Sequence, residues 1–351
     1  MGTGIFGFLK VLDGISDKDL VNIDIKKCIR YLNKHSSCSR CQENCPTGAI
    51  RLDGQDIRID GFLCTGCGIC LNVCPNPVFS LKDIEPGTVV KAAKDSELIT
   101  ICCSGKGTSL QVPCLGFLNE AVLLQMASIN KEVVLNMSAC QMCDYSTARE
   151  IILGHIDAAN SVLQCFLVKR QIKVKDDDTA IKPEHESFTR KFITHFSDRK
   201  PCYGYSRQSM FIDALKTLGP ASLKVMDAGN LPFGTIEVRS SCNGCGICVA
   251  VCPMDAITIE KNDDFLLMFK PFLCTGCGLC SQLCPEGSLC PGTDIDLDVL
   301  FREKTTKVIQ IKRVKCKECA TLFVPSYEQL LCASCKKNKD IEDSFFSHKQ
   351  Q

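Results

Sequence analysis

The chain has 351 residues, of which 28 are cysteine and none is tryptophan. Its 41 basic and 40 acidic side chains give a formal net charge of +1 at pH 7, so no positive excess is available to hold a nucleic-acid backbone. No apolar run approaches the ~18 residues of a membrane-spanning helix, and the first residues lack the features of a secretory signal. We therefore expect a cytoplasmic protein, in which so many cysteines indicate metal binding rather than disulfides.

The first cysteine-rich segment lies at residues 28–80 and holds two cysteine motifs. One follows the spacing C-x2-C-x2-C-x3-C-P, and the other departs from it because C-x9-C replaces the first C-x2-C. Three cysteines at C-x2-C-x2-C spacing can wrap one tight loop around a four-iron cluster, whose sulfurs accept hydrogen bonds from the loop amides. The cysteines are Cys64, Cys67, Cys70 and Cys74 in the regular motif and Cys28, Cys38, Cys41 and Cys45 in the other.

The next segment predicts alternating strands and helices. Leu98–Ile101 and Val133–Leu135 have the apolar runs of strands, and Leu118–Ile129 and Ser146–Leu167 have helical periodicity. This order predicts a small open parallel sheet, which binds ligands at the carboxyl ends of its strands. Five cysteines follow the two strands, namely Cys102, Cys103, Cys114, Cys140 and Cys143.

This middle segment resembles the small iron–sulfur delta subunit of methyl-viologen-reducing hydrogenases, which links a hydrogenase to a heterodisulfide-reductase-type complex. The matching pieces are Val112–Gly116 before a helix and Cys140–Tyr145 after a strand. The resemblance implies a further cluster on four of the five cysteines, with a two-iron form as one option. A redox-active dithiol of Cys140 and Cys143, a zinc site, or inert cysteines are the alternatives.

Residues 171–200 are charged and poor in apolar side chains, so we expect a linker there. Ser206–Leu218 predicts a helix that leads into the second cysteine-rich segment. Near the start of the chain, residues 4–15 predict a short helix with an apolar face that docks on this protein or on a partner.

The regular motif occurs twice in the second cysteine-rich segment, at residues 236–292. The heptapeptide Phe-Leu-Cys-Thr-Gly-Cys-Gly is identical at Phe62–Gly68 and Phe272–Gly278. The chain therefore holds two copies of one double-motif module. The cysteines of the second copy are Cys242, Cys245, Cys248, Cys252, Cys274, Cys277, Cys280 and Cys284.

Both modules resemble the bacterial two-cluster ferredoxins, in which the fourth cysteine of each motif ligates the cluster of the partner motif. The resemblance implies four [4Fe-4S] clusters, and exchange of the fourth ligand would hold the two clusters of a module within range for electron tunnelling. Zinc knuckles or inert thiols are the alternative, and a three-iron cluster without Cys28 is a further one at the first site. The implied ligand sets are Cys28, Cys38, Cys41 and Cys74; Cys45, Cys64, Cys67 and Cys70; Cys242, Cys245, Cys248 and Cys284; and Cys252, Cys274, Cys277 and Cys280.

The C-terminal segment holds two C-x2-C pairs, Cys316 with Cys319 and Cys332 with Cys335. Two such knuckles predict a closed tetrahedral sulfur site, which we interpret as a structural zinc ribbon. A rubredoxin-like mononuclear iron is the rival. Basic residues near the ribbon favour a solvated or partner-docking face.

Three cysteines and five histidines remain outside these patterns. Cys165 lies among apolar residues and predicts a core position. Cys202 stands alone before the second module, and Cys290 follows a module ligand by six residues, where it could replace that ligand but is expected to be a bystander. The histidines show no metal-site spacing and are expected at the surface or in the core.

We expect an α+β, multidomain fold in which two ferredoxin-like 2[4Fe-4S] modules flank a small α/β parallel-sheet domain, with a zinc ribbon at the C-terminus. The expected boundaries are 1–90 for the first module, 91–170 for the middle domain, 171–235 for a linker and helix, 236–300 for the second module, and 301–351 for the zinc-ribbon-like segment and tail.

These features favour a non-catalytic polyferredoxin that relays single electrons from a redox donor to a reductase, dehydrogenase or hydrogenase partner, or to a heterodisulfide-reductase-type subunit. Two alternatives belong to other classes. One is a thiol, disulfide or sulfur-compound reductase component with its active site at the middle cysteines. The other is a redox-sensing regulator that binds nucleic acid, against which the near-neutral charge argues.

Overall fold

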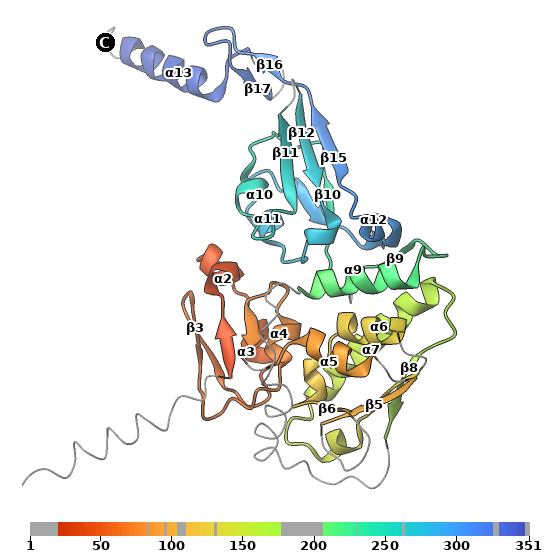
Figure 1. The fold of residues 1–351 in the computed structure, drawn as a ribbon. Coiled ribbons are helices and arrows are strands. Elements are labelled where there is room, and N and C mark those ends of the chain that lie inside the picture. Colours follow the sequence, from red (N-terminus) through yellow and green to blue (C-terminus); the bar gives the residue numbers. More distant parts are fainter. Residues whose placement is uncertain are drawn as a thin grey trace, which may run out of the picture. The chain divides into compact units, whose positions relative to one another are not determined.

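The computed structural model describes residues 20–82, 84–94, 97–103, 110–129, 132–176, 206–229, 231–261, 264–325 and 330–347. The chain divides into two compact units (Figure 1). The first runs up to Phe233 and takes in residues 275–277 and 294–302, and the second comprises the rest. The expected helix at 4–15 and Cys202 lie outside the described residues. In the ranges given, no helix combines the length and apolar character that a membrane span requires.

The first ferredoxin-like module is built from two short antiparallel strand pairs that carry the cysteine loops between them. β1 pairs with β4, and the hairpin of β2 and β3 turns at Gly54, whose φ of +57° suits glycine. Cys28 and Cys70 are buried in its core with Ile50, Val78 and Phe79. The elements are β1 (Val21–Ile23), η1 (Ile25–Lys27), α2 (Ile29–Leu32), α3 (Arg40–Glu43), β2 (Ile50–Asp53), β3 (Asp56–Ile59), α4 (Ile69–Val73) and β4 (Phe79–Leu81).

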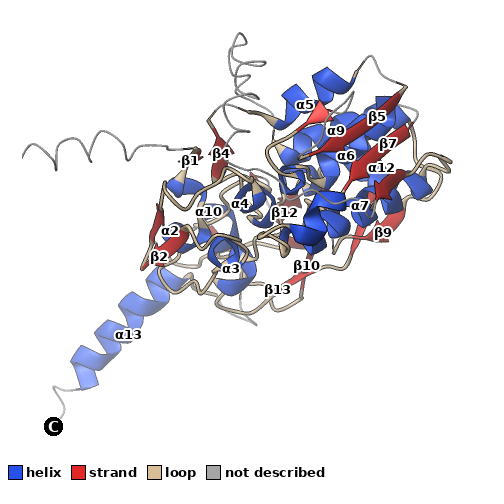
Figure 2. Cartoon of the chain, turned by 90° about the horizontal axis from the view of Figure 1, so that it is seen from below, coloured by secondary structure: helices blue, strands red, loops and turns tan. Residues whose placement is uncertain are grey.

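The middle domain contains the open parallel sheet that the sequence predicts. Its strand order is β6-β5-β7-β8, all parallel, and β5 and β7 lie side by side (Figure 2). The expectation of a linker from residue 171 is wrong at its start, because Ile172–Lys175 forms β8 and extends the sheet. Its elements are α5 (Pro86–Ala93), β5 (Leu98–Cys102), β6 (Leu110–Gln111), η2 (Leu115–Phe117), α6 (Glu120–Ile129), β7 (Glu132–Asn136), η3 (Ser138–Met142), α7 (Ala148–Cys165) and β8.

The expected helix after the charged segment is α9 (Arg207–Leu218), which belongs to the first unit and packs along α6. Ser206 caps it by accepting a hydrogen bond from the amide of Ser209. The ring of Phe211, in α9, packs edge to face against that of Phe233, with ring centroids 5.2 Å apart. β9 (Val225–Asp227), β14 (Asp294–Asp296) and α12 (Leu297–Phe301) complete this unit, with β9 and β14 antiparallel.

The second unit contains the second ferredoxin-like module and the C-terminal segment. Here a third strand, β15, pairs with β12 and converts the hairpin of β11 and β12 into a three-stranded sheet. Phe265, Leu267 and Phe269 of β12 lie in its buried core. The elements are β10 (Ile236–Val238), α10 (Ile247–Ala250), β11 (Ile257–Lys261), β12 (Phe265–Phe269), η4 (Pro271–Leu273), α11 (Leu279–Gln282), β13 (Leu289–Pro291), β15 (Thr306–Ile311), β16 (Val314–Lys315), β17 (Leu322–Phe323) and α13 (Ala333–Ser347).

Candidate metal centres

The first centre brings together Cys28, Cys38, Cys41 and Cys74, which border one cavity of about 20 Å³. Burial, with the neighbouring Cys38 and Cys28 thiols, raises the pKa of Cys41 to about 11. Burial, with the Cys41, Cys28 and Cys38 thiols nearby, likewise raises the pKa of Cys74 to about 12. Buried thiols such as those of Cys41 and Cys74, which resist ionisation on their own, are suited to a cationic metal core, whose charge favours the thiolate form.

The unusual C-x9-C spacing of this centre is accommodated by α2 and a clamp made by Arg30. The Arg30 guanidinium donates to the carbonyl oxygen of Cys38 at 3.1 Å and to that of Ser36 at 3.3 Å. It also reaches the turn of the β2–β3 hairpin, where Nη2 donates to Gly54 O at 2.7 Å. The added residues are therefore fixed to the module, and Cys28 is buried beside the other thiols.

The second centre brings Cys45 to the C-x2-C-x2-C loop. Burial, with Cys45 and Cys64 nearby, raises the pKa of Cys67 to about 11. Burial also raises the pKa of Cys70 far above its usual range, as do the thiols of Cys67, Cys64, Cys45 and Cys41. The fourth cysteine of each motif thus sits with the other motif's loop, and Cys70 of the second centre lies near Cys41 of the first.

In the second module, the third centre gathers Cys284 with the first loop. Burial raises the pKa of Cys242, and Cys245 and Cys284 act in the same direction. Burial, with Cys280 and Cys242 nearby, raises the pKa of Cys248 to about 11. The amide of Ser288 donates to Cys284 Sγ at 3.3 Å, a contact of the kind that tunes a ligating sulfur.

The fourth centre rests on the loop between η4 and α11 and on the residue that follows α10. Cys274 ends η4, Cys280 lies on α11, and Cys277 lies in the loop between them. Cys252 accepts a hydrogen bond at Sγ from the amide of Ala256, at 3.3 Å. Its membership of this centre is what the ferredoxin resemblance implies.

The middle-domain cysteines converge at the carboxyl edge of the sheet, as the sequence predicts. A hydrogen bond with the Cys103 thiol and burial raise the pKa of Cys140 far above its usual range, and Cys114 and Cys143 add to this effect. Burial also raises the pKa of Cys114, to which Cys103 and Cys143 contribute. Four thiols therefore form one group, which we call the middle site. Cys102 ends β5 and is buried.

Backbone amides donate hydrogen bonds to two sulfurs of the middle site. Gly116 donates to Cys114 Sγ at 3.3 Å, and Tyr145 donates to Cys143 Sγ at 3.4 Å. Both amides lie two residues beyond the sulfur they contact. Such donors stabilise sulfur with thiolate character and are typical of iron–sulfur and zinc sites.

The C-terminal cysteines form a tighter group than a cubane requires. The four Sγ atoms of Cys316, Cys319, Cys332 and Cys335 all lie within 4.8 Å of one another, and those of Cys319 and Cys332 are 3.7 Å apart. A tetrahedron with metal–sulfur bonds of about 2.3 Å has edges of about 3.8 Å. The amides of Cys319 and Cys332 lower the pKa of Cys316 to about 6. The arrangement fits one tetrahedral ion.

Two of the remaining cysteines, Cys165 and Cys290, lie among the described residues. Cys165 is buried at the end of α7, which confirms its core position. Cys290 is half-buried in β13, opposite Glu237 of β10.

The sequence analysis missed a buried polar network between α6, α7 and α9. Glu120 is fully buried, with His155 Nδ1 2.8 Å from one carboxylate oxygen and Arg207 bound to both. Burial alone would raise the pKa of Glu120, but Arg207 and His155 lower it to about 2. A single acid on the otherwise apolar face of Leu118–Ile129 was the available signal.

Known proteins match the chain through its two modules. The family described as a 4Fe-4S dicluster domain matches twice, over residues 27–78 and 241–288. A protein of the ion-translocating oxidoreductase complex of Methanosarcina acetivorans is 40% identical over 45 residues, which are 13% of this chain and 17% of that protein. The pyruvate synthase subunit PorD of Methanocaldococcus jannaschii is 39% identical over 54 residues, which are 15% of this chain and 55% of that protein.

The chain thus spans less than two thirds of the length of either relative. The resemblance of the middle segment to a hydrogenase delta subunit and the zinc assignment stay predictions. The double match and the cysteine geometry agree on the modules. The chain contains two 4Fe-4S dicluster domains, through which it is similar to subunits of oxidoreductase complexes.

Proposed function

We propose that this chain is a cytoplasmic, non-catalytic relay that passes single electrons from a redox donor to a reductase-, dehydrogenase- or hydrogenase-type partner and binds no nucleic acid. The observation that carries the proposal is the exchange of Cys74 and Cys45 between the two loops of the first module. This exchange holds two centres side by side, as a path for electrons requires. A [4Fe-4S] cluster supplies reversible one-electron redox chemistry when bound.

In this proposal the protein binds four cubanes through the four ligand sets implied by the ferredoxin resemblance. The cysteine thiols supply the ligands, and loop amides such as that of Ser288 donate to sulfur and tune the potential. Burial of Cys28, Cys70 and Cys248 shields these three ligands from water. The chain itself then transforms no substrate.

We further propose that the middle site holds a fifth iron–sulfur cluster on Cys103, Cys114, Cys140 and Cys143. Their mutual proximity and the two amide donors at Cys114 and Cys143 support this assignment. Cys102 is left out of this set because it is the last residue of β5, whereas Cys103 follows the strand and contacts Cys140.

At the C-terminus we propose a structural zinc ion on Cys316, Cys319, Cys332 and Cys335. The 3.7 Å separation of two sulfurs supports a mononuclear site. Tetrahedral iron also accepts four sulfurs, so metal analysis has to discriminate the two.

Metal analysis of the anaerobically purified full-length chain tests these assignments together. About 18 to 20 irons with matching sulfide and one zinc per chain support four cubanes, a middle cluster and a zinc ribbon. About 16 irons would leave four cubanes and no middle cluster. About 8 irons with several zincs, unchanged by reconstitution with iron and sulfide, would contradict the relay.

A thiol or disulfide reductase is the second candidate, because the thiols of Cys140 and Cys103 are in hydrogen-bond contact. It predicts turnover of a disulfide substrate by the isolated, reduced chain that is lost in Cys140→Ser or Cys143→Ser. A relay predicts electron transfer to a partner without such turnover.

A further inference from the structure

The thiols of Cys114 and Cys67 belong to different candidate centres yet are near neighbours. After burial, Cys67 is the strongest influence that raises the pKa of Cys114. Cys114 opens η2 in the middle domain, and Cys67 lies in the loop that leads into α4 of the first module. The middle site and the second centre therefore meet along these two short segments.

The loop that leads into α4 and η2 pack so closely that a larger residue would clash at two positions, Gly68 and Gly116. A Cβ atom on Gly68 would lie 2.9 Å from Cδ2 and 3.1 Å from Cα of Phe117. A Cβ atom on Gly116 would lie 2.7 Å from Cγ1 of Ile69. Phe117 and Ile69 are themselves buried. In the second module, by contrast, a Cβ atom on Gly278 would meet only Nε2 of Gln282, at 3.8 Å.

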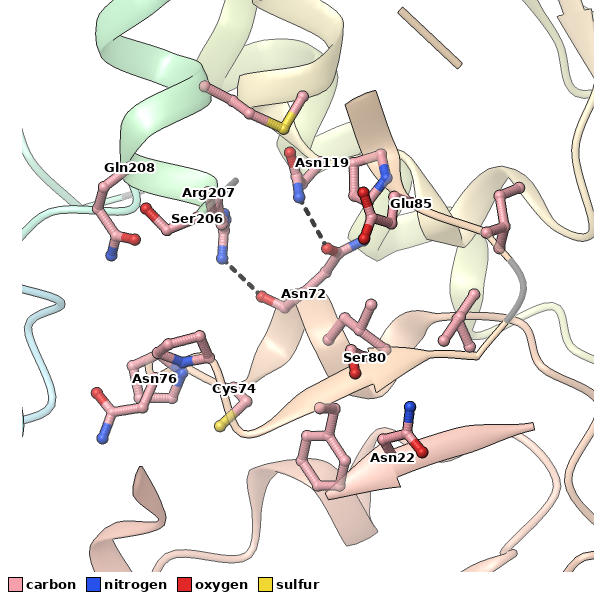
Figure 3. Close-up of a pocket in the computed structure, with 18 of the residues that line it drawn as sticks. Asn22, Asn72, Cys74, Asn76, Ser80, Glu85, Asn119, Ser206, Arg207 and Gln208 are labelled. Carbon is pink, nitrogen blue, oxygen red and sulfur yellow. Dashed lines mark hydrogen bonds between the residues drawn. The ribbon is translucent and has the colours of Figure 1, made fainter. Parts of the chain in front are cut away.

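Asn72, which lies in α4 between Cys70 and Cys74, stabilises this contact through hydrogen bonds. Its side-chain amide donates to the carbonyl oxygen of Gly116 at 2.7 Å, a fully buried hydrogen bond. Its side-chain oxygen accepts from Asn119 at 3.0 Å, and its backbone oxygen accepts from Arg207 at 2.8 Å (Figure 3). One residue thus joins the ligand-bearing helix of the first module to η2, α6 and α9.

A second connection between the two centres involves Tyr145. Tyr145 follows Cys143 by two residues, and its hydroxyl pKa is raised first by burial and then by Cys143, Asp144 and Cys67. The side chain of Tyr145 therefore lies near sulfurs of both the middle site and the second centre. Such packed, bonded segments do not slide independently.

We infer that Asn72, Gly68, Gly116 and Phe117 hold the middle site and the second centre as one rigid pair, so that an electron passes directly between them. The inference rests on the proposed middle cluster. In each step one electron leaves one centre as the other gains it, and no bond forms or breaks. Because Cys70 lies near Cys41, the order in this unit is middle site, second centre, first centre.

Magnetic resonance of the reduced full-length chain tests the pair. We expect the signal of the middle site to be split or broadened by the second centre, and this interaction to be lost in Gly116→Ala, whose methyl group would force η2 away from Ile69. Asn72→Ala removes the fastening hydrogen bond without adding bulk and should weaken the interaction as well. Gly154→Ala is the matched control, because nothing lies within 4 Å of a Cβ atom there.

Iron content separates the possible failures. Cys140→Ser with Cys143→Ser should lower iron; if iron is unchanged, the middle cluster is absent and the inference fails with that part of the proposed function. If the double variant loses iron as expected but the wild-type spectrum shows no magnetic interaction between the two centres, the middle cluster stands and only the inference of a rigid pair is overturned. An interaction that persists in both Gly116→Ala and Asn72→Ala, with normal iron content, also overturns it.

Discussion

The guanidinium of Arg207 binds both carboxylate oxygens of the fully buried Glu120, with Nε donating to Oε1 at 2.6 Å. His155 completes the group at 2.8 Å, and Arg207 also donates to the backbone of Asn72. A charged group so far from water remains ionised because its partners are fixed around it. This network therefore joins α9 to α6, α7 and α4.

Removal of one partner should expose the strength of this network. In Arg207→Met, Glu120 would lose its main counter-charge inside the protein, and we expect a loss of about 3–5 kcal/mol in the free energy of unfolding of the first unit. Guanidinium unfolding under anaerobic conditions, followed by far-ultraviolet circular dichroism, measures it. The control is Lys173→Met, which breaks an exposed ion pair with Glu132 and should cost about 0–1 kcal/mol. Equal losses in the two variants would contradict the assignment.

The same pair predicts an acid limit. The pKa of Glu120 falls from 4.5 to about 2 on folding, so its contribution is complete above 4.5 and is lost as the pH falls towards 2. The stability difference between wild type and Arg207→Met should therefore be largest near neutral pH and narrow below about pH 4.5. Thermal unfolding at a series of pH values checks this, and a difference that stays constant down to pH 3 would contradict it.

The Arg30 clamp predicts a selective effect on the first centre. Arg30→Ala removes the contacts with Ser36, Cys38 and Gly54, which frees the inserted residues and weakens the hold of Cys28. We expect a three-iron signal and the loss of about one iron per chain. Arg58→Ala is the control, since the Arg58 side chain is 72% exposed and its ion pair with Asp53 is long, at 3.7 Å. Unchanged iron content in Arg30→Ala would show that Cys28 is held without the clamp.

The C-terminal site predicts a metal loss that leaves the clusters intact. Cys316→Ser removes one of four converging sulfurs, so zinc should fall by about one ion per chain while iron and sulfide stay constant. Elemental analysis measures all three, and Cys290→Ser should change none of them. Iron that falls in step with the substitution, in place of zinc, would identify a mononuclear iron site.

Substitution of single cysteines in the middle domain tests which thiols bind iron at the middle site. Cys140→Ser should remove the iron of this site because the thiol contacts Cys103 and lies near Cys114 and Cys143. Cys165→Ser changes a thiol that is equally buried but lies at the end of α7, and it should keep full iron. Visible absorption and iron content after anaerobic purification compare the two variants.

Local spacing was enough to predict the ferredoxin loops, the pairing of motifs and the parallel sheet of the middle domain. A C-x2-C-x2-C loop with glycines between the ligands dictates its own backbone path, as the φ values of +67° at Gly66 and +78° at Gly68 illustrate. Apolar periodicity likewise located α7, which buries one face, and a nearly continuous apolar sequence located α6, which is buried on most sides.

Tertiary structure alone decided how these pieces work together. β8 carries too many charges to look like a strand, and it forms because the edge of β7 offers it backbone hydrogen bonds. The ion pair of Glu120 and Arg207 joins residues 87 positions apart, and the hydrogen bond from Asn72 to Gly116 spans 44. Spacing along a chain fixes which atoms one loop can present. Contacts between distant loops depend on how whole elements pack, and this packing is what brings Cys114 to Cys67.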